Sequence, residues 1–445
     1  MLSLLLIMTL TVPIAFEDQN DWRHWRGPLA TGEAPGANPP VEWSASKNVH
    51  WKVDVPGLGH GTPIIADGRI YLTTAMPQPS GEAEKEEEET GGAAGLVRGG
   101  RGRGRGRGGA PAVPHEFMAM CLDLETGKEI WRKTLVTEKP HEGGHPTNSQ
   151  ASASPVIAGD KLYVPFGSRG LHCLSLDGEI VWSKDLGKMQ TRNQFGEGST
   201  PAVYGDWIVQ NWDHEGDSFI VAFDRHTGEE KWRKSRDEVT SWATPLILPV
   251  GDQTQVIVPA TNFTRAYELE TGKEIWRCSG LTTNCIPSPI EWNGLVYVMS
   301  GYRGNMLQAI DPKGAEGDIT ETDHVVWTFD RHTPYVPSPL LYEGNLYFLS
   351  HFRGMISCHD AKTGAVHYGP ERLEALAEVY ASPIGAAGRV YIPGRAGTTV
   401  VLQAGKEFKI LATNELPDEI DASPVAIGNK LLLRGHDALY CLAEK

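Results

Sequence analysis

Short apolar runs, each ended by a turn, fill most of this chain, and one stretch shows the unit clearly. Apolar runs at 245–248, 255–259 and 265–269 are followed by the tight turn Glu270-Thr271-Gly272 and by the alternating segment 273–277. Short runs rich in β-branched and aromatic residues, bounded by turn residues, are typical of strands joined as hairpins. The pattern therefore predicts a sheet of four antiparallel strands.

This unit repeats along the chain. A proline that follows Ser or Thr opens an apolar run eight times, at Pro63, Pro155, Pro201, Pro245, Pro289, Pro339, Pro383 and Pro424. The intervals between successive prolines are 92, 46, 44, 44, 50, 44 and 41 residues. A period near 44 residues is typical of repeat folds such as propellers with four-stranded blades. The sequence predicts an all-β fold, an eight-bladed β-propeller of four-stranded blades.

The two ends of the chain complement each other. The last unit stops after its third strand, and the segment 50–55 near the N-terminus has the Trp-containing pattern of the outer strands. Pairing of these ends closes the ring and leaves no open sheet edge. We therefore expect the last blade to be closed by an N-terminal strand.

An aromatic residue marks most of the predicted outer strands. These residues are Trp131, Trp182, Trp232, Trp276 and Trp327, with Phe408 near the same place in the degenerate seventh unit. A large ring at a fixed blade position is suited to packing between neighbouring blades, where it buries much apolar area.

The chain divides into three predicted parts. Residues 1–16 are almost wholly apolar, precede acidic residues, and are predicted to be a cleaved signal peptide. Residues 17–47 are expected to form an extended N-terminal arm, and 48–445 the propeller. An acidic and Arg-Gly insertion at 77–116 in blade one has few apolar residues and is predicted to be disordered.

Charge and targeting narrow the classes of partner and compartment. The net charge of −15 disfavours nucleic-acid binding. The predicted signal peptide indicates export to the periplasm or the cell exterior, with no transmembrane span after cleavage. We expect a monomer.

Four of the six cysteines, Cys121, Cys173, Cys358 and Cys441, recur at one repeat position and are predicted to be buried as small apolar residues. Cys278 and Cys285 lie seven residues apart across a loop, and in an oxidising compartment they can form a disulfide or stay free.

Arginines recur in the predicted loops between second and third strands. They are Arg169, Arg303, Arg353 and Arg395, and Arg265 lies in the corresponding loop of the fourth unit. If they point into the channel, they form a ring of guanidinium groups suited to carboxylate or phosphate. The alternative is that each arginine fits a tight turn and pairs with a neighbouring carboxylate.

A polar and aromatic set is predicted on the same face. It comprises His60, His141, His145, Asn148, Gln150, Gln194, Glu197, Trp212, Asp213, His214, Glu215, Trp242, His351 and Tyr380. Asp213 with His214 is a candidate acid–base pair, and the oxygen-bearing residues are candidate Ca²⁺ ligands. The alternative is that these side chains satisfy loop backbone groups. His141 and His145 have a metal-like spacing, but Gly143, Gly144 and Pro146 oppose a helix, so no zinc site is expected there.

The segment Leu124-Glu125-Thr126-Gly127-Lys128-Glu129-Ile130-Trp131 and its copies resemble the tryptophan-docking repeat of quinoprotein-type propellers. Trp25-Arg26-Gly27-Pro28, Asn211–Gly216 and Thr240–Pro245 are similar to a group of exported propellers, containing repeats like those of pyrroloquinoline quinone (PQQ) enzymes, in Planctomycetes-type bacteria. More distantly, the chain resembles the propeller lipoprotein of outer-membrane protein assembly.

Three functions are consistent with these features: the resemblance implies the first two, and the predicted arginine ring suggests the third. The first is a binding or scaffold module that takes a small anionic ligand, a glycan or a protein on its channel face. The second is a PQQ- and Ca²⁺-dependent alcohol-type dehydrogenase, with Asp213 as base and Trp242, Trp212, His214 and the loop arginines around the cofactor. The third is a hydrolase or lyase of an anionic glycan.

Departures from the dehydrogenases favour the first function. The vicinal disulfide typical of the alcohol enzymes is missing, because no two cysteines are adjacent, and there is no Cys-x-x-Cys-His haem motif. We therefore expect a binding or scaffold propeller without a bound metal.

Overall fold

The computed structural model describes residues 21–78 and 113–444. The predicted signal peptide and most of the predicted insertion lie outside these residues. The segment between the two strands is slightly shorter than the predicted insertion, because Pro77 is the last residue of one strand and His115 is the first residue of the next.

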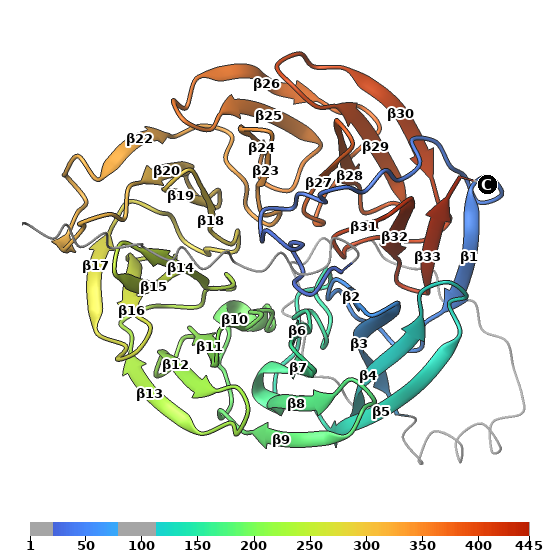
Figure 1. Ribbon diagram of the computed structural model, residues 1–445, viewed down its shortest axis with the longest axis horizontal. Coiled ribbons are helices and arrows are strands. Elements are labelled where there is room, and N and C mark those ends of the chain that lie inside the picture. Colours follow the sequence, from blue (N-terminus) through green and yellow to red (C-terminus); the bar gives the residue numbers. More distant parts are fainter. Residues whose placement is uncertain (1–20, 79–112, 445) are drawn as a thin grey trace, which may run out of the picture.

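Eight sheets stand around a central axis, as predicted (Figure 1). The first four blades, each from its inner to its outer strand, are β2 (Ile64–Ala66), β3 (Arg69–Pro77), β4 (His115–Asp123), β5 (Glu129–Glu138); β6 (Val156–Ala158), β7 (Lys161–Pro165), β8 (Leu171–Ser175), β9 (Ile180–Lys184); β10 (Ala202–Tyr204), β11 (Trp207–Trp212), β12 (Phe219–Asp224), β13 (Glu230–Ser235); and β14 (Leu246–Val250), β15 (Gln253–Val258), β16 (Thr264–Glu268), β17 (Glu274–Cys278).

The second four blades complete the ring. They are β18 (Ile290–Trp292), β19 (Leu295–Ser300), β20 (Met306–Ile310), β22 (Val325–Phe329); β23 (Leu340–Tyr342), β24 (Asn345–Leu349), β25 (Met355–Asp360), β26 (Val366–Arg372); β27 (Ile384–Ala386), β28 (Arg389–Pro393), β29 (Thr398–Gln403), β30 (Ile410–Glu415); and β31 (Val425–Ile427), β32 (Lys430–Arg434), β33 (Ala438–Ala443), β1 (Val49–Asp54).

Only short elements lie outside this scheme in the described residues. The strand β21 (Gly317–Asp318) adds a parallel fifth strand to blade four beside β17, and η1 (Gly167–Arg169) and η2 (Arg192–Gln194) are single 3-10 turns. No helix in this part of the chain has the length and apolarity needed to cross a membrane.

The N-terminal strand closes the ring as predicted. Strand β1 runs antiparallel to β33, with Trp51 opposite Cys441 and Lys52 opposite Tyr440 (Figure 1). The last blade is therefore composite, and its outer edge is paired with a segment from the other end of the chain.

The predicted tryptophans lie between blades and reach the next blade's outer hairpin. Trp131 donates its indole N–H to the carbonyl of Leu176, Trp182 to that of Arg225, and Trp232 to that of Leu269. Trp276 is an exception. It bonds to Gln255 of its own blade because blade five replaces the short hairpin by the longer segment that contains β21. In blade six, Tyr368 occupies the corresponding position, opposite Cys358, and Phe408 packs against it.

The glycine of the Thr-Gly hairpin is required by this contact. A Cβ atom at Gly272 would lie 2.6 Å from the Trp232 ring, and φ there is +66°. Gly251 has a similar φ of +61° but faces open space. Both replacements by alanine share a cost of about 1–2 kcal/mol for the left-handed backbone.

We expect Gly272→Ala to lower the free energy of unfolding by about 1–3 kcal/mol more than Gly251→Ala, because only the first forces the new methyl group into an indole ring. Urea unfolding of the two variants measures this difference. Equal losses would show that the ring moves aside without cost.

The cysteines are buried and free. Cys121, Cys173, Cys358 and Cys441 lie in the blade cores as predicted. The Cys278 thiol contacts the carbonyl of Ser279, whereas that of Cys285 contacts the carbonyl of Thr282, so these two do not form a disulfide in this structure.

The N-terminal arm, 21–47, crosses the inner strands of several blades (Figure 1). Trp22 exchanges two backbone hydrogen bonds of 2.8 Å with Ile65 of β2. The buried Arg26 side chain donates to the carbonyls of Pro383 and Pro339 in two other blades. The arm thus ties together blades that are not neighbours.

Candidate functional site

A cavity of about 830 Å³ lies where the inner strands of the blades begin. Its wall contains all eight hydroxyl residues that precede the repeat prolines, here called the hydroxyl ring: Thr62, Ser154, Thr200, Thr244, Ser288, Ser338, Ser382 and Ser423. Because every blade contributes one member, this cavity is the central channel of the propeller.

Hydrogen bonds run from blade to blade along the hydroxyl ring. The backbone N–H of one member donates to the hydroxyl of the next in six of the eight steps, at 2.8–2.9 Å. At Thr244 the hydroxyl instead accepts the indole N–H of Trp25 at 3.1 Å. Trp25 lines the cavity, so the arm supplies part of its wall.

A second ring lines the same cavity. The residue two positions before each hydroxyl also faces it, and these residues, here called the variable ring, are His60, Ser152, Gly198, Trp242, Ile286, Val336, Tyr380 and Asp421. The hydroxyl ring is nearly uniform, whereas the variable ring differs in charge, size and aromaticity from blade to blade. The variable ring therefore gives the channel its individual chemistry.

Four aromatic residues, here called the aromatic arc, form one side of the cavity: Tyr302, Tyr335, Phe352 and Tyr380. Tyr302 stacks on Tyr335 with centroids 4.8 Å apart, and Phe352 stacks on Tyr380 at 5.7 Å. Tyr335 and Phe352 join the two pairs at 6.2 Å. Aromatic faces carry a partial negative charge and bury large apolar areas, so the arc is a platform for C–H or cationic groups.

A cluster of two histidines and one carboxylate lies at the boundary between blades eight and one. His436 Nε2 lies 2.8 Å from Asp421 Oδ2, and His60 Nε2 lies 3.6 Å from the same oxygen. The two imidazoles stack with centroids 5.0 Å apart. Burial lowers the pKa of His60 to about 4, so this ring is neutral at pH 7. The hydrogen bond to Asp421 raises the pKa of His436.

The predicted cofactor residues divide into two groups. Trp242 and Arg303 line the cavity. Trp242 is held by a 2.7 Å hydrogen bond from its indole N–H to the carbonyl of Gly196. The Arg303 guanidinium lies 5.4 Å from the Tyr302 ring and makes no ion pair with any described residue.

The predicted ring of inward-facing arginines does not form. Arg169 is buried and paired with Glu138 and Glu197. Arg395 pairs with Glu378, Glu419 and Asp421. Arg353 is exposed and does not line the cavity. The alternative, turn arginines paired with carboxylates, therefore describes Arg169 and Arg395.

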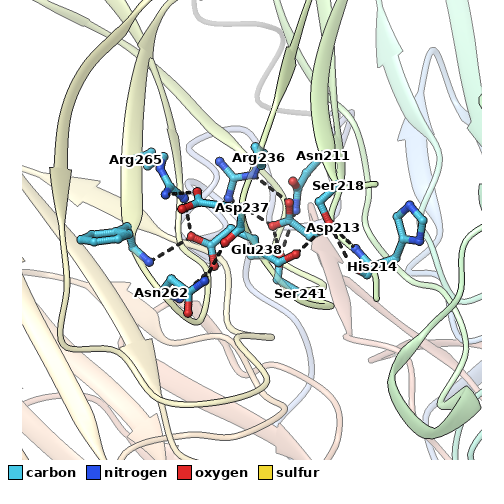
Figure 2. Close-up of polar contacts among 12 residues, drawn as sticks. Asn211, Asp213, His214, Ser218, Arg236, Asp237, Glu238, Ser241, Asn262 and Arg265 are labelled. Atoms are coloured by element: carbon cyan, nitrogen blue, oxygen red, sulfur yellow. Dashed lines mark hydrogen bonds and ion pairs between the residues drawn. The ribbon is translucent and has the colours of Figure 1, made fainter. Parts of the chain in front are cut away.

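Asp213 is fully buried. Figure 2 shows its carboxylate bound to the guanidinium of Arg236. Its two carboxylate oxygens accept from Arg236 at 2.7 and 3.1 Å, and one of them also accepts from Ser241. Burial is the largest influence and would lower the pKa of Arg236, but the charge and hydrogen bonds of Asp213, together with Tyr267 and Glu238, raise it overall. Asp213 is not in the cavity wall, and this geometry does not support its assignment as a base acting there.

Trp212 and His214, like Asp213, are not in the cavity wall. Trp212 is buried and stacks on Phe219 with centroids 5.8 Å apart. His214 Nδ1 accepts the backbone N–H groups of Gln190 and Gly216. Both residues support the loop rather than line the cavity.

The rest of the predicted polar set is also divided. His60, His145, Asn148, Gln194, Glu197 and Tyr380 line the cavity, whereas His141, Gln150, Glu215 and His351 do not. His141 Nε2 contacts the carbonyl of Met189, and Glu215 accepts from Thr240, which is the structural role given as the alternative.

Sequence reasoning missed Asp421, His436 and Tyr335. A signal for Asp421 was present, because Asp421-Ala422-Ser423-Pro424 and His60-Gly61-Thr62-Pro63 occupy the same place in their repeats. Since the eighth and first blades are neighbours in a closed ring, that alignment brings the two residues together.

Comparison with known proteins supports the fold. The family model described as outer membrane protein assembly factor BamB matches residues 118–245 and 216–445, well over half of the chain. The polyvinylalcohol dehydrogenase of Pseudomonas sp is 23% identical over 287 residues, which are 59% of this chain and 41% of that protein. The chain thus spans about two-fifths of the length of this curated relative.

Two solved structures have similar architecture. The quinohemoprotein alcohol dehydrogenase ADHIIG from Pseudomonas putida HK5 has a TM-score of 0.56 at 10% identity, over 96% of this chain and 80% of that one. The computationally designed Ika8 protein has a TM-score of 0.51 at 12% identity, over 74% of this chain and 92% of that one. At these identities the likeness shows the fold alone.

Proposed function

Because this chain belongs to the family of the outer membrane protein assembly factor BamB, and because the described part of its central channel has an aromatic wall and no ring of free cations, we propose that it is a binding module whose ligand is a neutral glycan held in the channel. The observation that carries the proposal is the aromatic arc beside the hydroxyl ring.

The chemistry of the wall fits a sugar ring better than an anion. The faces of Tyr380 and Phe352 can pack against the C–H face of a sugar, and the hydroxyl ring and the amides Asn148 and Gln194 offer hydrogen bonds to its hydroxyls. Within the described residues, Arg303 is the only arginine in the cavity wall, which also contains the carboxylates Glu197 and Asp421. An anionic ligand would meet these carboxylates.

The same wall does not fit a PQQ enzyme. The quinone carries several carboxylates, which need more cationic partners than Arg303 supplies. The proposed base, Asp213, is occupied by Arg236. Of the two tryptophans predicted to lie around the cofactor, Trp242 lines the cavity and Trp212 does not. We therefore derive no redox chemistry for this chain.

Export remains part of the proposal. It is supported by the apolar segment 1–16, which has the length of a signal peptide. A glycan-binding propeller would then meet its ligand outside the cytoplasm.

A glycan array of neutral and anionic polysaccharide fragments, followed by tryptophan-fluorescence titration of the fragments that bind, tests the proposal. We expect Tyr380→Ala and Trp242→Ala to weaken binding by about tenfold or more, since aromatic anchors dominate such sites. Trp207→Ala, a tryptophan change outside the cavity wall, is the control and should leave the affinity unchanged.

Two results would contradict the proposal. One is binding of anionic fragments alone, with no neutral fragment bound. The other is calcium-dependent PQQ binding that is lost in Trp242→Ala, which would restore the dehydrogenase hypothesis.

A further inference from the structure

The cluster of His60, Asp421 and His436 has the composition of a metal site. One ligand atom from each residue lies within 4.8 Å of the other two. His60 precedes the inner strand of blade one, Asp421 precedes that of blade eight, and His436 lies in the turn between β32 and β33. The closed ring brings these three segments together, so the cluster exists only in the folded chain.

Two atoms of the cluster are buried without a hydrogen bond. They are His60 Nε2 and Asp421 Oδ1. A buried polar atom without a partner costs about 1–3 kcal/mol, so such atoms call for an explanation. His60 Nε2 and His436 Nε2 both face Asp421 Oδ2, at 3.6 and 2.8 Å, whereas Asp421 Oδ1 lies 3.3 Å from Arg395 Nε. A cation bound among His60, Asp421 and His436 would give the buried His60 Nε2 the partner that it lacks.

The surrounding charges suit a cation. Arg395 lies 3.3 Å from Asp421 Oδ1, but Glu378 and Glu419 pair with the same guanidinium. Three carboxylates therefore face one arginine. Glu419 also lies 3.8 Å from His436 Nδ1, the ring nitrogen that does not face Asp421. A carboxylate behind a ligating histidine is a common device for orienting the imidazole toward a metal.

We propose that His60, Asp421 and His436 bind a divalent transition-metal ion of the Zn²⁺ class, with a further coordination position open to the central cavity. Two imidazoles and one carboxylate are ligands that Zn²⁺ accepts, whereas Ca²⁺ takes oxygen ligands. Ligand atoms around a tetrahedral Zn²⁺ stand about 3.4 Å apart, so small side-chain rotations close the site. Its open position can take water or an oxygen atom of a ligand in the cavity, because His60 and Asp421 both line that cavity.

Isothermal titration of the chelator-treated protein with Zn²⁺, without any glycan, tests this site apart from the proposed glycan function. We expect one ion per chain. Substitution of Co²⁺ should give the intense visible absorption of a tetrahedral site, and Ca²⁺ should not compete.

His60→Asn is the decisive variant, because the Nε2 atom of His60 has no hydrogen bond to lose and the variant should keep the melting temperature of the metal-free protein. We expect it to weaken Zn²⁺ binding more than about 10-fold, as should His436→Asn. His145→Asn, a cavity histidine outside the cluster, is the matched control. Unchanged Zn²⁺ affinity in His60→Asn and His436→Asn, or displacement of Zn²⁺ by Ca²⁺, would overturn the proposal.

Discussion

Replacement of Asp213 by asparagine is expected to lower the free energy of unfolding by about 3–5 kcal/mol, because it leaves the Arg236 charge buried without a counter-ion. The side chains of both residues are fully buried. Tyr267 remains as a neutral partner of Arg236, but one phenol oxygen cannot replace two carboxylate bonds (the Asp213 contacts are drawn in Figure 2).

Urea unfolding monitored by circular dichroism measures this loss. Asp206→Asn is the matched control, since the Asp206 side chain is 76% exposed and the variant should change stability little. The double variant Asp213→Asn with Arg236→Met removes both charges and should recover much of the loss. A single variant Asp213→Asn with the stability of the wild type would show that Asp213 is not needed for folding and would reopen its assignment as a functional group.

This prediction also distinguishes two reasons why a variant of Asp213 could be inactive. For a catalytic carboxylate, the asparagine variant keeps its fold and loses only its reaction. For a carboxylate that neutralises a buried arginine, the fold weakens first. Any functional assay of Asp213 variants therefore needs a parallel stability measurement.

Trp22→Ala is expected to cost about 3–5 kcal/mol, because it removes a fully buried indole from the core that joins the arm to the ends of the ring. The same core contains residues of β1 and β33, the pair that closes the propeller. Loss of Trp22 should therefore loosen the arm and the closing blade together.

Trp25→Ala, three residues further along the arm, is the natural comparison. Its indole is only partly buried, lines the cavity, and bonds to one hydroxyl. We expect a smaller loss of stability and a weaker affinity for glycan. Differential scanning calorimetry with fluorescence titration separates the two effects. A larger loss of stability in Trp25→Ala than in Trp22→Ala would contradict the view that Trp22 is the anchor of the arm.

The variable ring explains how one repeat can carry individual chemistry. In every blade a Ser or Thr occupies the same place in the hydroxyl ring. The residue two positions before it differs from blade to blade. Tyr380 thus extends the aromatic arc, and Asp421 joins two histidines. The scaffold and the site are encoded at neighbouring positions of the same motif.

The propeller was predictable because its signals are local and repeated. The interval between the repeat prolines, the Thr-Gly hairpins and the outer-strand tryptophans each depend on a few adjacent residues, and eight copies reinforce one another. Even the closure by 50–55 followed from a local pattern. The predicted strands of the fourth blade match β14 to β17 to within two residues at each end.

The site was only partly predictable, because burial and pairing arise between segments far apart in the chain. The sequence placed Trp242, His60 and Arg303 on the correct face, since position in the repeat decides the face. It could not show that Arg236 neutralises Asp213 or that Glu197 holds Arg169, because nothing in the repeat specifies which charges meet. It also could not bring His60 to Asp421 and His436 without the closed ring. The sequence by itself determined the fold and the positions that line the channel. Only the tertiary structure decided which charged side chains are neutralised by ion pairs inside the protein and which face the channel.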